Sequence, residues 1–205
     1  MKPAVLCITR QALPVHIPQS NAFGIYDIDL KTISEDQFHF INRDVVDSLT
    51  TDRLNIGQAL PQILGYTVIQ CGDEVLSYSR KKGAEARLHG SRSIGFGGHV
   101  DITDYTQTAG YIGALIQACK RELLEELGLT VHIQDQQFTS LIVDQRNPVG
   151  SVHLGLALHI ELEQKAQVCI DEHEISDPVW KNLNQLKHEA EEYENWSKLI
   201  IEQMA

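Results

Sequence analysis

The sequence predicts an α/β protein in which a mixed central sheet lies between helices. Two hairpin-like pairs of apolar segments and two helical segments support this. The first pair flanks Cys71-Gly72-Asp73, and the second flanks the turn-rich stretch 145–150. Strands and helices mixed in this order suit a layered α/β/α arrangement. We divide the chain into an N-terminal extension, residues 1–60, packed on a core domain, residues 61–205.

The predicted strands follow from apolar segments bounded by turn residues. In the extension, one short apolar run spans 5–8, and mixed helix signals follow at 44–60. In the core domain we predict strands at 66–70, 74–79, 141–144 and 151–162. The last of these alternates strictly, and one face carries Val152, Leu154, Leu156, Leu158, Ile160 and Leu162. A period of two over this length is typical of a strand with one buried face.

A helix is predicted over residues 112–127, with one apolar side and one charged side. The apolar side chains recur at spacings near three and four, at Ile112, Leu115, Ile116, Cys119, Leu123 and Leu127. Gly128 stands where a glycine commonly ends a helix. A second helix is predicted from about residue 183, with Leu186, Ala190, Tyr193, Trp196 and Ile200 on one face.

Three carboxylates, those of Glu122, Glu125 and Glu126, project from one side of the first helix. At about 100° per residue, Glu122 and Glu126 lie about 40° apart around the axis, and Glu125 lies about 60° to the other side of Glu122. A solvated acidic face, the alternative interpretation, would carry bases three or four residues away. Here Arg121 and Lys120 are adjacent instead. Clustered carboxylates without interleaved bases suit a hard divalent cation, Mg²⁺ or Mn²⁺.

The string that begins at Arg121 and ends at Leu129, R-E-L-L-E-E-L-G-L, resembles the second half of the Nudix box. This box is the signature of hydrolases that act on a nucleoside diphosphate linked to another group. Its pattern is G-x5-E-x7-R-E-U-x-E-E-x-G-U, in which U is aliphatic. The resemblance runs from about residue 60 to the C-terminus and implies the Nudix-type α/β/α sandwich with a mixed sheet.

The first half of the box departs from the family pattern. The positions of the family's first glutamate and glycine are occupied by Gly113 and Gln107. The family's glycine pair is found upstream in S-I-G-F-G-G-H, where Gly98 lies 23 positions before Arg121 instead of 14. The box therefore carries a nine-residue insertion, and this variant resembles a subgroup described as phosphoesterases of the Nudix superfamily. We hypothesise that Asp101 supplies the missing carboxylate or a partner for Arg121, and the alternative is a turn-capping aspartate.

The resemblance and the carboxylates together imply metal-dependent hydrolysis of a pyrophosphate. Glu122 and Glu126 are the predicted metal ligands, and Glu125 is a third ligand or orients the attacking water. Arg121 would hold a glutamate in place by hydrogen bonding. The general base is not assigned, and the candidates lie in the acidic loop that we predict before Trp180, namely Asp171, Glu172, Glu174 and Asp177.

Substrate binding is predicted around the glycine pair. The backbone of Gly97 and Gly98 allows close approach of a ligand, and His99 directly follows it. Five bases precede the pair in an otherwise acidic chain, at Arg80, Lys81, Lys82, Arg87 and Arg92. Arg87 and Arg92 are our candidates for binding phosphate, and a solvated loop paired with acids is the alternative.

Composition excludes some classes of function. The chain has 205 residues and a net charge of −11, which argues against a nucleic-acid or anionic-membrane surface. Four cysteines, Cys7, Cys71, Cys119 and Cys169, are scattered without a C-x-x-C pair, which argues against zinc and for a cytoplasmic protein. No segment has the length of a membrane span. The expected partner is a small phosphorylated molecule, a nucleotide derivative, and the extension could also form a homodimer contact.

Two other functions stay open at this point. An isomerase of isoprenoid diphosphates on the same fold would need a reactive cysteine and a glutamate facing each other, and Cys119 lies on the buried stripe instead. A non-catalytic Nudix-like module that binds a nucleotide or regulates a partner is allowed by the altered first half of the box. Retention of Arg121 and all three helix glutamates argues against that module.

Overall fold

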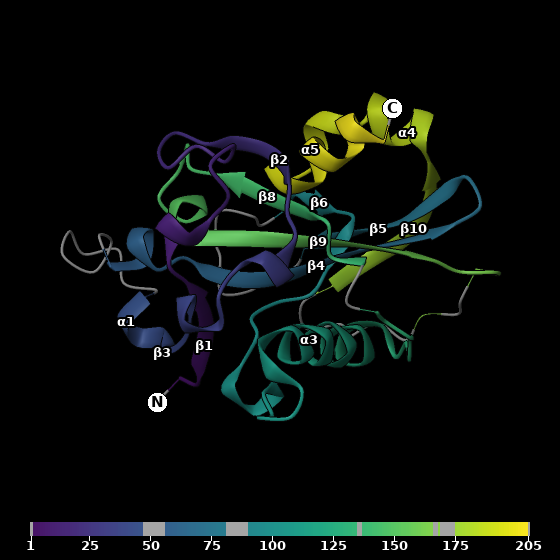
Figure 1. The fold of residues 1–205 in the computed structure, drawn as a ribbon. Coiled ribbons are helices and arrows are strands. Elements are labelled where there is room, and N and C mark those ends of the chain that lie inside the picture. Colours follow the sequence, from purple (N-terminus) through teal and green to yellow (C-terminus); the bar gives the residue numbers. More distant parts are fainter. Residues whose placement is uncertain are drawn as a thin grey trace.

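The computed structural model describes residues 2–46, 56–80, 90–134, 137–165, 168 and 175–204. Within them one mixed sheet of ten strands forms the middle layer (Figure 1). Its main path runs through β10 (Ile175–Asn182), β5 (Glu74–Arg80), β4 (Gln62–Cys71), β9 (His153–Glu161), β8 (Ser140–Asp144) and β2 (Phe23–Asp27). Four strands pair off this path, namely β1 (Ala4–Ile8), β3 (Phe38–Asn42), β6 (Arg92–Ser93) and β7 (Gly95–Phe96). β4 and β9 are parallel, and the other pairs are antiparallel.

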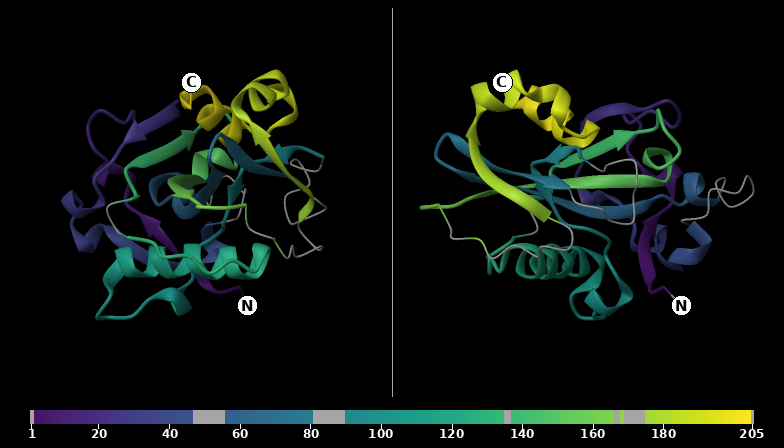
Figure 2. Two further views of the ribbon diagram at one scale, coloured as in Figure 1. Left: turned by 90° about the vertical axis from the view of Figure 1, so that its right-hand side faces the viewer. Right: turned by 180° about the vertical axis from the view of Figure 1, so that it is seen from behind.

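Helices cover both faces of the sheet (Figures 1 and 2). One face is covered by α3 (Gly110–Leu127), and the other by α4 (Leu183–His188) and α5 (Asn195–Gln203). A short α1 (Arg43–Val46) follows β3. The 3-10 turns are η1 (Arg10–Ala12), η2 (Leu30–Thr32), η3 (Glu35–Gln37), η5 (Ile102–Asp104), η7 (Gly150–Val152) and η8 (Ala190–Glu192). The predicted α/β/α arrangement with a mixed sheet is confirmed.

The side chains of β9 alternate as predicted between the apolar core beneath α3 and the apolar core beneath α4 and α5. Leu154, Leu156, Leu158 and Ile160 are buried in the core that α3 covers. Gly155 faces the other way, and a Cβ on it would come within 2.7 Å of the ring of Trp196 in α5. Both predicted hairpins are present, because β4 pairs with β5 and β8 pairs with β9, each antiparallel.

Helix α3 has the predicted core face and the predicted end. Four of its apolar residues, Leu115, Cys119, Leu123 and Leu127, are fully buried, while Ile112 and Ile116 are partly buried against the same core. Gly128 adopts a left-handed conformation, with φ of 66°, and its N–H caps the last turn. The three glutamates lie off this core face, where Glu122 and Glu126 are half-buried and Glu125 is exposed.

The C-terminal segment differs from the single helix that the apolar spacing predicted. It is divided into α4, η8 and α5, and the chain is extended between the last two. There Tyr193 forms a parallel bridge with Arg92, and the N–H of Glu194 donates to the carbonyl of Arg92 (3.0 Å). Leu186, Tyr193 and Ile200 are nevertheless buried in one core. Their helical spacing therefore reflected a shared core and not one continuous helix.

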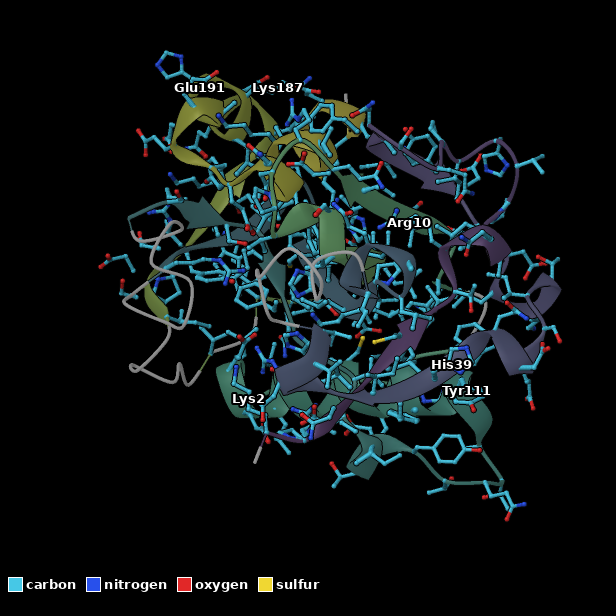
Figure 3. All side chains as sticks on the ribbon, turned by 90° about the vertical axis from the view of Figure 1, so that its left-hand side faces the viewer. Lys2, Arg10, His39, Tyr111, Lys187 and Glu191 are labelled. Carbon is cyan, nitrogen blue, oxygen red and sulfur yellow. The ribbon has the colours of Figure 1, made fainter. Side chains whose placement is uncertain are left out.

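The N-terminal segment supplies strands that the sequence analysis did not predict. β1 pairs with β3 over five residue pairs, and β2 pairs with β8 at the end of the main path. Arg10, which is labelled in Figure 3, is buried. It donates from Nε to the carbonyl of Gln58 (2.6 Å) and from Nη2 to the carbonyl of Ser151 (2.8 Å). The division of the chain at residue 60 stays a prediction. Among the described residues, no helix is both long enough and apolar enough to cross a membrane.

Candidate active site

The glycine pair lies directly against the glutamates of α3. The N–H of Gly97 donates to Oε2 of Glu126 (3.1 Å). A Cβ on Gly98 would lie 2.8 Å from Oε1 of Glu122. The loop is held there because β7 pairs with β4, with Phe96 opposite Thr67. The two halves of the variant box, separated by the insertion, thus meet in space.

Arg121 joins the carboxylates to the glycine loop. Its Nη1 donates to Oε1 of Glu122 (2.7 Å) and to Oε2 of Glu125 (3.3 Å). Its Nη2 donates to the carbonyl oxygen of His99 (3.1 Å). Arg121 is therefore placed to fix the orientation of the glutamates, as its position in the box implies.

Asp104, and not Asp101, is the aspartate that pairs with Arg121. Nε of Arg121 donates to Oδ1 of Asp104 (3.0 Å), and Nη2 donates to Oδ2 (2.9 Å), a bidentate pair. The Asp104 side chain is only 4% exposed. Hydrogen bonding to Asp104 is the main reason that the pKa of Arg121 is raised.

The bidentate contact with Arg121 is therefore made by Asp104, and the role of Asp101 as an extra carboxylate of the site stays a prediction. Asp101 is the N-cap residue of η5, and its N–H donates to Oδ2 of Asp104 (2.9 Å). Asp101 therefore lies where the alternative interpretation placed it, as an aspartate that caps a turn at the start of the insertion. One turn of η5 separates the two residues, and that turn brings Asp104 back over Arg121. The sequence could not distinguish them, since both follow the glycine loop within the insertion.

The N-terminal strand holds this inserted loop in place. The N–H of Leu6 donates to the carbonyl of Val100 (2.8 Å), and Val5 forms an antiparallel bridge with Asp101. β1 therefore fixes the chain just before η5. Residues of the extension, for which sequence alone indicated no chemistry, thus support the placement of Asp104 on Arg121.

The donor set fits a hard divalent cation, although its oxygens are engaged within the protein. The described residues contain no group of three or more His, Cys, Asp or Glu arranged as a metal site. Oε1 of Glu122 and Oε2 of Glu125 accept from Arg121, and Oε2 of Glu126 accepts from Gly97. Three neighbouring carboxylates still supply the oxygen ligands that Mg²⁺ and Mn²⁺ prefer. A cation bound here would compete with Arg121 for the oxygens of Glu122 and Glu125, and with the N–H of Gly97 for that of Glu126.

His99 contributes its backbone to the site and directs its ring elsewhere. The ring centroid lies 5.7 Å from that of His153, in an edge-on contact. His153 and Gly155 lie on the same face of β9. On that face, Gly155 packs against Trp196 of α5. The carbonyl of His99 faces Arg121 instead. A role for the ring in substrate binding stays a prediction.

Arg92, one of the two predicted phosphate-binding arginines, is not brought to the glutamates by this structure. Arg92 donates from Nε and Nη2 to Oγ of Ser77 (3.1 and 3.0 Å) and from Nη1 to Oγ of Ser79 (3.0 Å). These serines alternate along β5 with Leu76 and Tyr78, which are buried in the core beneath α3. The Arg92 side chain therefore lies on the opposite face of the sheet. Arg87 lies outside the described residues.

Of the four candidates for the general base, the structure describes Asp177. Asp171, Glu172 and Glu174 lie outside the described residues. Asp177 is exposed in β10, at an irregularity in its pairing with β5, and has a left-handed φ of 49°. Strand β10 was not predicted, because its sequence was interpreted as an acidic loop.

Cys119 is buried in the core of α3, as its place on the apolar stripe predicts. A Cβ on Gly65 would lie 2.5 Å from its Sγ. Burial raises the pKa of the Cys119 thiol to about 12. A thiol of this kind is a poor nucleophile at neutral pH, so it does not support an isomerase that depends on a reactive cysteine.

Comparison with known proteins gives a relative in sequence and several in structure. No family model matches the chain. Protein YmaB of Bacillus subtilis (strain 168) is 34% identical over 145 residues, which cover 69% of this chain and 69% of that protein. The crystal structure of Tm1382, a candidate Nudix hydrolase, matches with a TM-score of 0.65 and 20% identity, covering 98% of this chain and 97% of that one.

Two further structures carry nucleotide ligands. The NUDIX domain of Shewanella oneidensis NrtR, complexed with ADP ribose, matches with a TM-score of 0.53 and 19% identity, covering 70% of this chain and 86% of that one. A bifunctional NMN adenylyltransferase/ADP ribose pyrophosphatase from Francisella tularensis, complexed with AMP and a Mn ion, has a TM-score of 0.51 and 16% identity. That match covers 70% of this chain and 41% of the other. The structural likenesses confirm the fold that the box implies.

Proposed function

We propose that this chain, which belongs to the same family as Protein YmaB of Bacillus subtilis and has the Nudix fold, is a metal-dependent pyrophosphate hydrolase. Its substrate would be a nucleoside diphosphate linked to another group. One observation carries the proposal: Glu122 and Glu126 meet the Gly97-Gly98 backbone, and Arg121 joins Glu122 to Glu125. The nucleotide ligands of two structural neighbours support the substrate class.

Glu122 and Glu126 would hold the cation, with Glu125 as a third ligand. When bound, Mg²⁺ or Mn²⁺ would neutralise phosphate oxygens and lower the pKa of a coordinated water. The carboxylates lie on one rigid helix that is buried along its other side. A rigid support of this kind keeps reacting groups in a fixed relative position.

Arg121 and the glycine pair have supporting roles in this proposal. Arg121 is itself fixed by Asp104 and by the carbonyl of His99, so it can hold Glu122 and Glu125 in one orientation. Gly97 and Gly98 present backbone without side chains beside Glu126 and Glu122, where a phosphate could approach closely. No disulfide joins the described cysteines, Cys7, Cys71 and Cys119, which supports a cytoplasmic location.

A nucleotide-binding module without catalysis is the second candidate. It is favoured by Gly113, which occupies the position of the first box glutamate, and by the ion pairs between Arg121 and two helix glutamates. The bidentate contact of Asp104 with Arg121 argues for the hydrolase, because it restores a carboxylate that the altered box lacks.

Hydrolysis of a substrate panel distinguishes the two candidates. The panel comprises ADP ribose, other dinucleotides, nucleotide sugars and nucleoside triphosphates, each with Mg²⁺ or Mn²⁺. Products are separated by ion-exchange chromatography. We expect the wild type to cleave at least one of these at the pyrophosphate, and the Glu126→Gln variant to be inactive. Binding of ADP ribose without cleavage of any panel member would favour the non-catalytic module.

A further inference from the structure

A pyrophosphate entering this site would meet a strongly acidic surface. Arg121 is near the glutamates, but its guanidinium is engaged by Asp104, Glu122, Glu125 and the carbonyl of His99. Arg92 lies on the opposite face of the sheet. A further cation among the described residues is Arg80, at the end of β5.

Contacts on the α3 face of the sheet link Arg80 to the glycine pair. The guanidinium carbon of Arg80 lies 5.8 Å from the ring centroid of Tyr78, two residues earlier on the same face of β5. The Tyr78 ring lies 4.6 Å from that of Phe96, and its hydroxyl donates to the carbonyl of Gly95 (2.8 Å). Phe96 directly precedes Gly97, whose N–H binds Glu126. Tyr78 thus contacts both Arg80 and Phe96, the residue that precedes the glycine pair.

Glu194 holds Arg80 from the other side. Nη2 of Arg80 lies 3.5 Å from Oε1 of Glu194, whose side chain is only 8% exposed. The same oxygen accepts hydrogen bonds from Ser93 (2.6 Å) and from Tyr66 (2.9 Å). Because these contacts fix the glutamate, it can position the arginine although their own ion pair is long.

One donor of Arg80 is left without an acceptor in the described part of the chain. Among the described residues, its buried Nε has no hydrogen-bond partner. The side chain as a whole is 32% exposed. Burial lowers the pKa of Arg80, but Tyr78, Glu194 and Glu126 act in the opposite direction, and the net pKa is raised. The influence of Glu126 agrees with a location near the α3 carboxylates.

We propose that Arg80, positioned by Glu194, binds a phosphate group of the substrate next to the glutamates of α3. This inference rests on the proposed function, since it assigns a binding residue for the same substrate. Arg80 is the binding residue, and Glu194 is a positioning residue that acts through it. A planar guanidinium can bind phosphate through two parallel hydrogen bonds.

Binding of inorganic pyrophosphate tests the inference without requiring turnover. Affinity is measured by calorimetry with Mg²⁺ for the wild type and the Arg80→Gln variant. Loss of charge-assisted hydrogen bonds should weaken pyrophosphate binding about tenfold. Binding of Mn²⁺ alone, followed by its electron paramagnetic resonance, should not weaken, because the variant removes a positive charge near the proposed ligands and none of the ligands themselves. If a cleaved substrate is known, its KM should rise more than kcat falls, because the lost contact exists before the reaction.

Arg146→Gln is the matched control. Arg146 likewise pairs with a buried aspartate, Asp144 (3.1 Å), and its guanidinium lies over an aromatic ring, that of Phe23. It belongs to the segment that follows β8, outside the cluster formed by α3 and the glycine pair. Pyrophosphate affinity in this control should match the wild type.

Two more variants separate binding from folding. Arg80→Lys keeps the charge but loses the planar fork, so its affinity should lie between those of the wild type and Arg80→Gln. Glu194→Gln keeps an oxygen that can accept from Ser93 and Tyr66, and it should weaken pyrophosphate binding through the loss of its hold on Arg80. If Arg80→Gln fails to fold, these two variants decide the question.

Unchanged pyrophosphate affinity in the folded Arg80 and Glu194 variants would overturn the inference, whatever the activity of the wild type. The reverse result is also informative. A wild type that cleaves nothing, but binds pyrophosphate through Arg80, would contradict the proposed hydrolase and leave the phosphate site in place.

Discussion

Glu126 accepts a hydrogen bond from the glycine loop and is also a proposed metal ligand. A substitution by glutamine can separate these two roles. Its Oε2 accepts from Gly97, and the amide oxygen of a glutamine could accept the same bond. We therefore expect Glu126→Gln to keep the fold and to lose the metal-dependent hydrolysis. The control is Glu191→Gln, because Glu191 is exposed near α4 (Figure 3) and its ion pair is with Lys198, far along the chain from α3. Wild-type turnover of Glu126→Gln at limiting Mg²⁺ would exclude this residue from the mechanism.

Asp104 should matter far more than Asp101. Asp104→Asn removes the charge from a buried, bidentate partner of Arg121, and we expect a loss of about 2 kcal/mol in the free energy of unfolding. Hydrolysis should fall strongly as Arg121 loses its fixed orientation. Asp101→Asn should leave the kinetics nearly unchanged across a magnesium titration, since Asp101 caps η5. Urea unfolding and steady-state rates measure both, and equal effects would contradict the assignment.

At the scale of residues, local pattern predicted the helix glutamates and the glycine pair, but not which other charges join them. The positions of Glu122 and Glu126 follow from helical periodicity, and they do face the glycine loop. Arg92 and Arg80 both flank a loop in the sequence, and only the pairing of β5 with β6 puts their side chains on different faces. Such a difference depends on strand register, which a single sequence does not fix.

At the scale of elements, a side chain at Gly97 would have a different effect from a side chain at Gly98. A Cβ on Gly98 would meet the flexible end of Glu122, at 2.8 Å from Oε1, so the carboxylate could move aside. A Cβ on Gly97 would lie 2.5 Å from the backbone oxygen of Gly65, at a φ of 135° that side chains rarely adopt. We expect Gly98→Ala to weaken Mn²⁺ binding with little change in melting temperature.

Gly97→Ala provides the contrast for that measurement. Because backbone must shift to admit its methyl group, we expect Gly97→Ala to lower the melting temperature by several degrees. Calorimetric melting and Mn²⁺ titration on both variants test the distinction. A destabilised Gly98→Ala with normal Mn²⁺ affinity would show that the loop does not touch the metal ligands as proposed.

Elements with strong local signals were predicted well, and elements defined by distant partners were not. Helix α3 and strand β9 carry clear apolar periodicity, and their apolar faces are buried as expected. β2 and β3 are predominantly half-buried or exposed, so they show no clean alternation, and pairing with β8 and β1 defines them. The break before α5 arises because Tyr193 and Glu194 bond to Arg92, about a hundred residues earlier.

At the scale of the whole molecule, segments distant in sequence assemble the candidate site. β1 fixes the loop that carries Asp104, β7 fixes the glycine pair, and α3 supplies the glutamates. Glu194 reaches Arg80 from the start of the C-terminal helix. Destabilising the packing of β1 should therefore impair the site as well as the fold, because the insertion would lose its support.

The last prediction concerns metal binding and stability together. Glu122, Glu125 and Glu126 repel one another on one helix side, and Arg121 relieves only part of this repulsion through its contacts with two of them. A cation that binds only the folded chain adds about 2.7 kcal/mol at a hundred times its dissociation constant. We expect millimolar Mg²⁺ or Mn²⁺ to raise the melting temperature of the wild type by roughly 5 °C or more. The Glu122→Gln, Glu126→Gln double variant should be at least as stable without metal, since repulsion falls, but should lose most of this rise. Scanning calorimetry with and without metal measures both proteins, with Glu191→Gln as the control for a lost surface charge. Equal shifts in the wild type and the double variant would place the cation elsewhere and remove the basis for hydrolysis at α3.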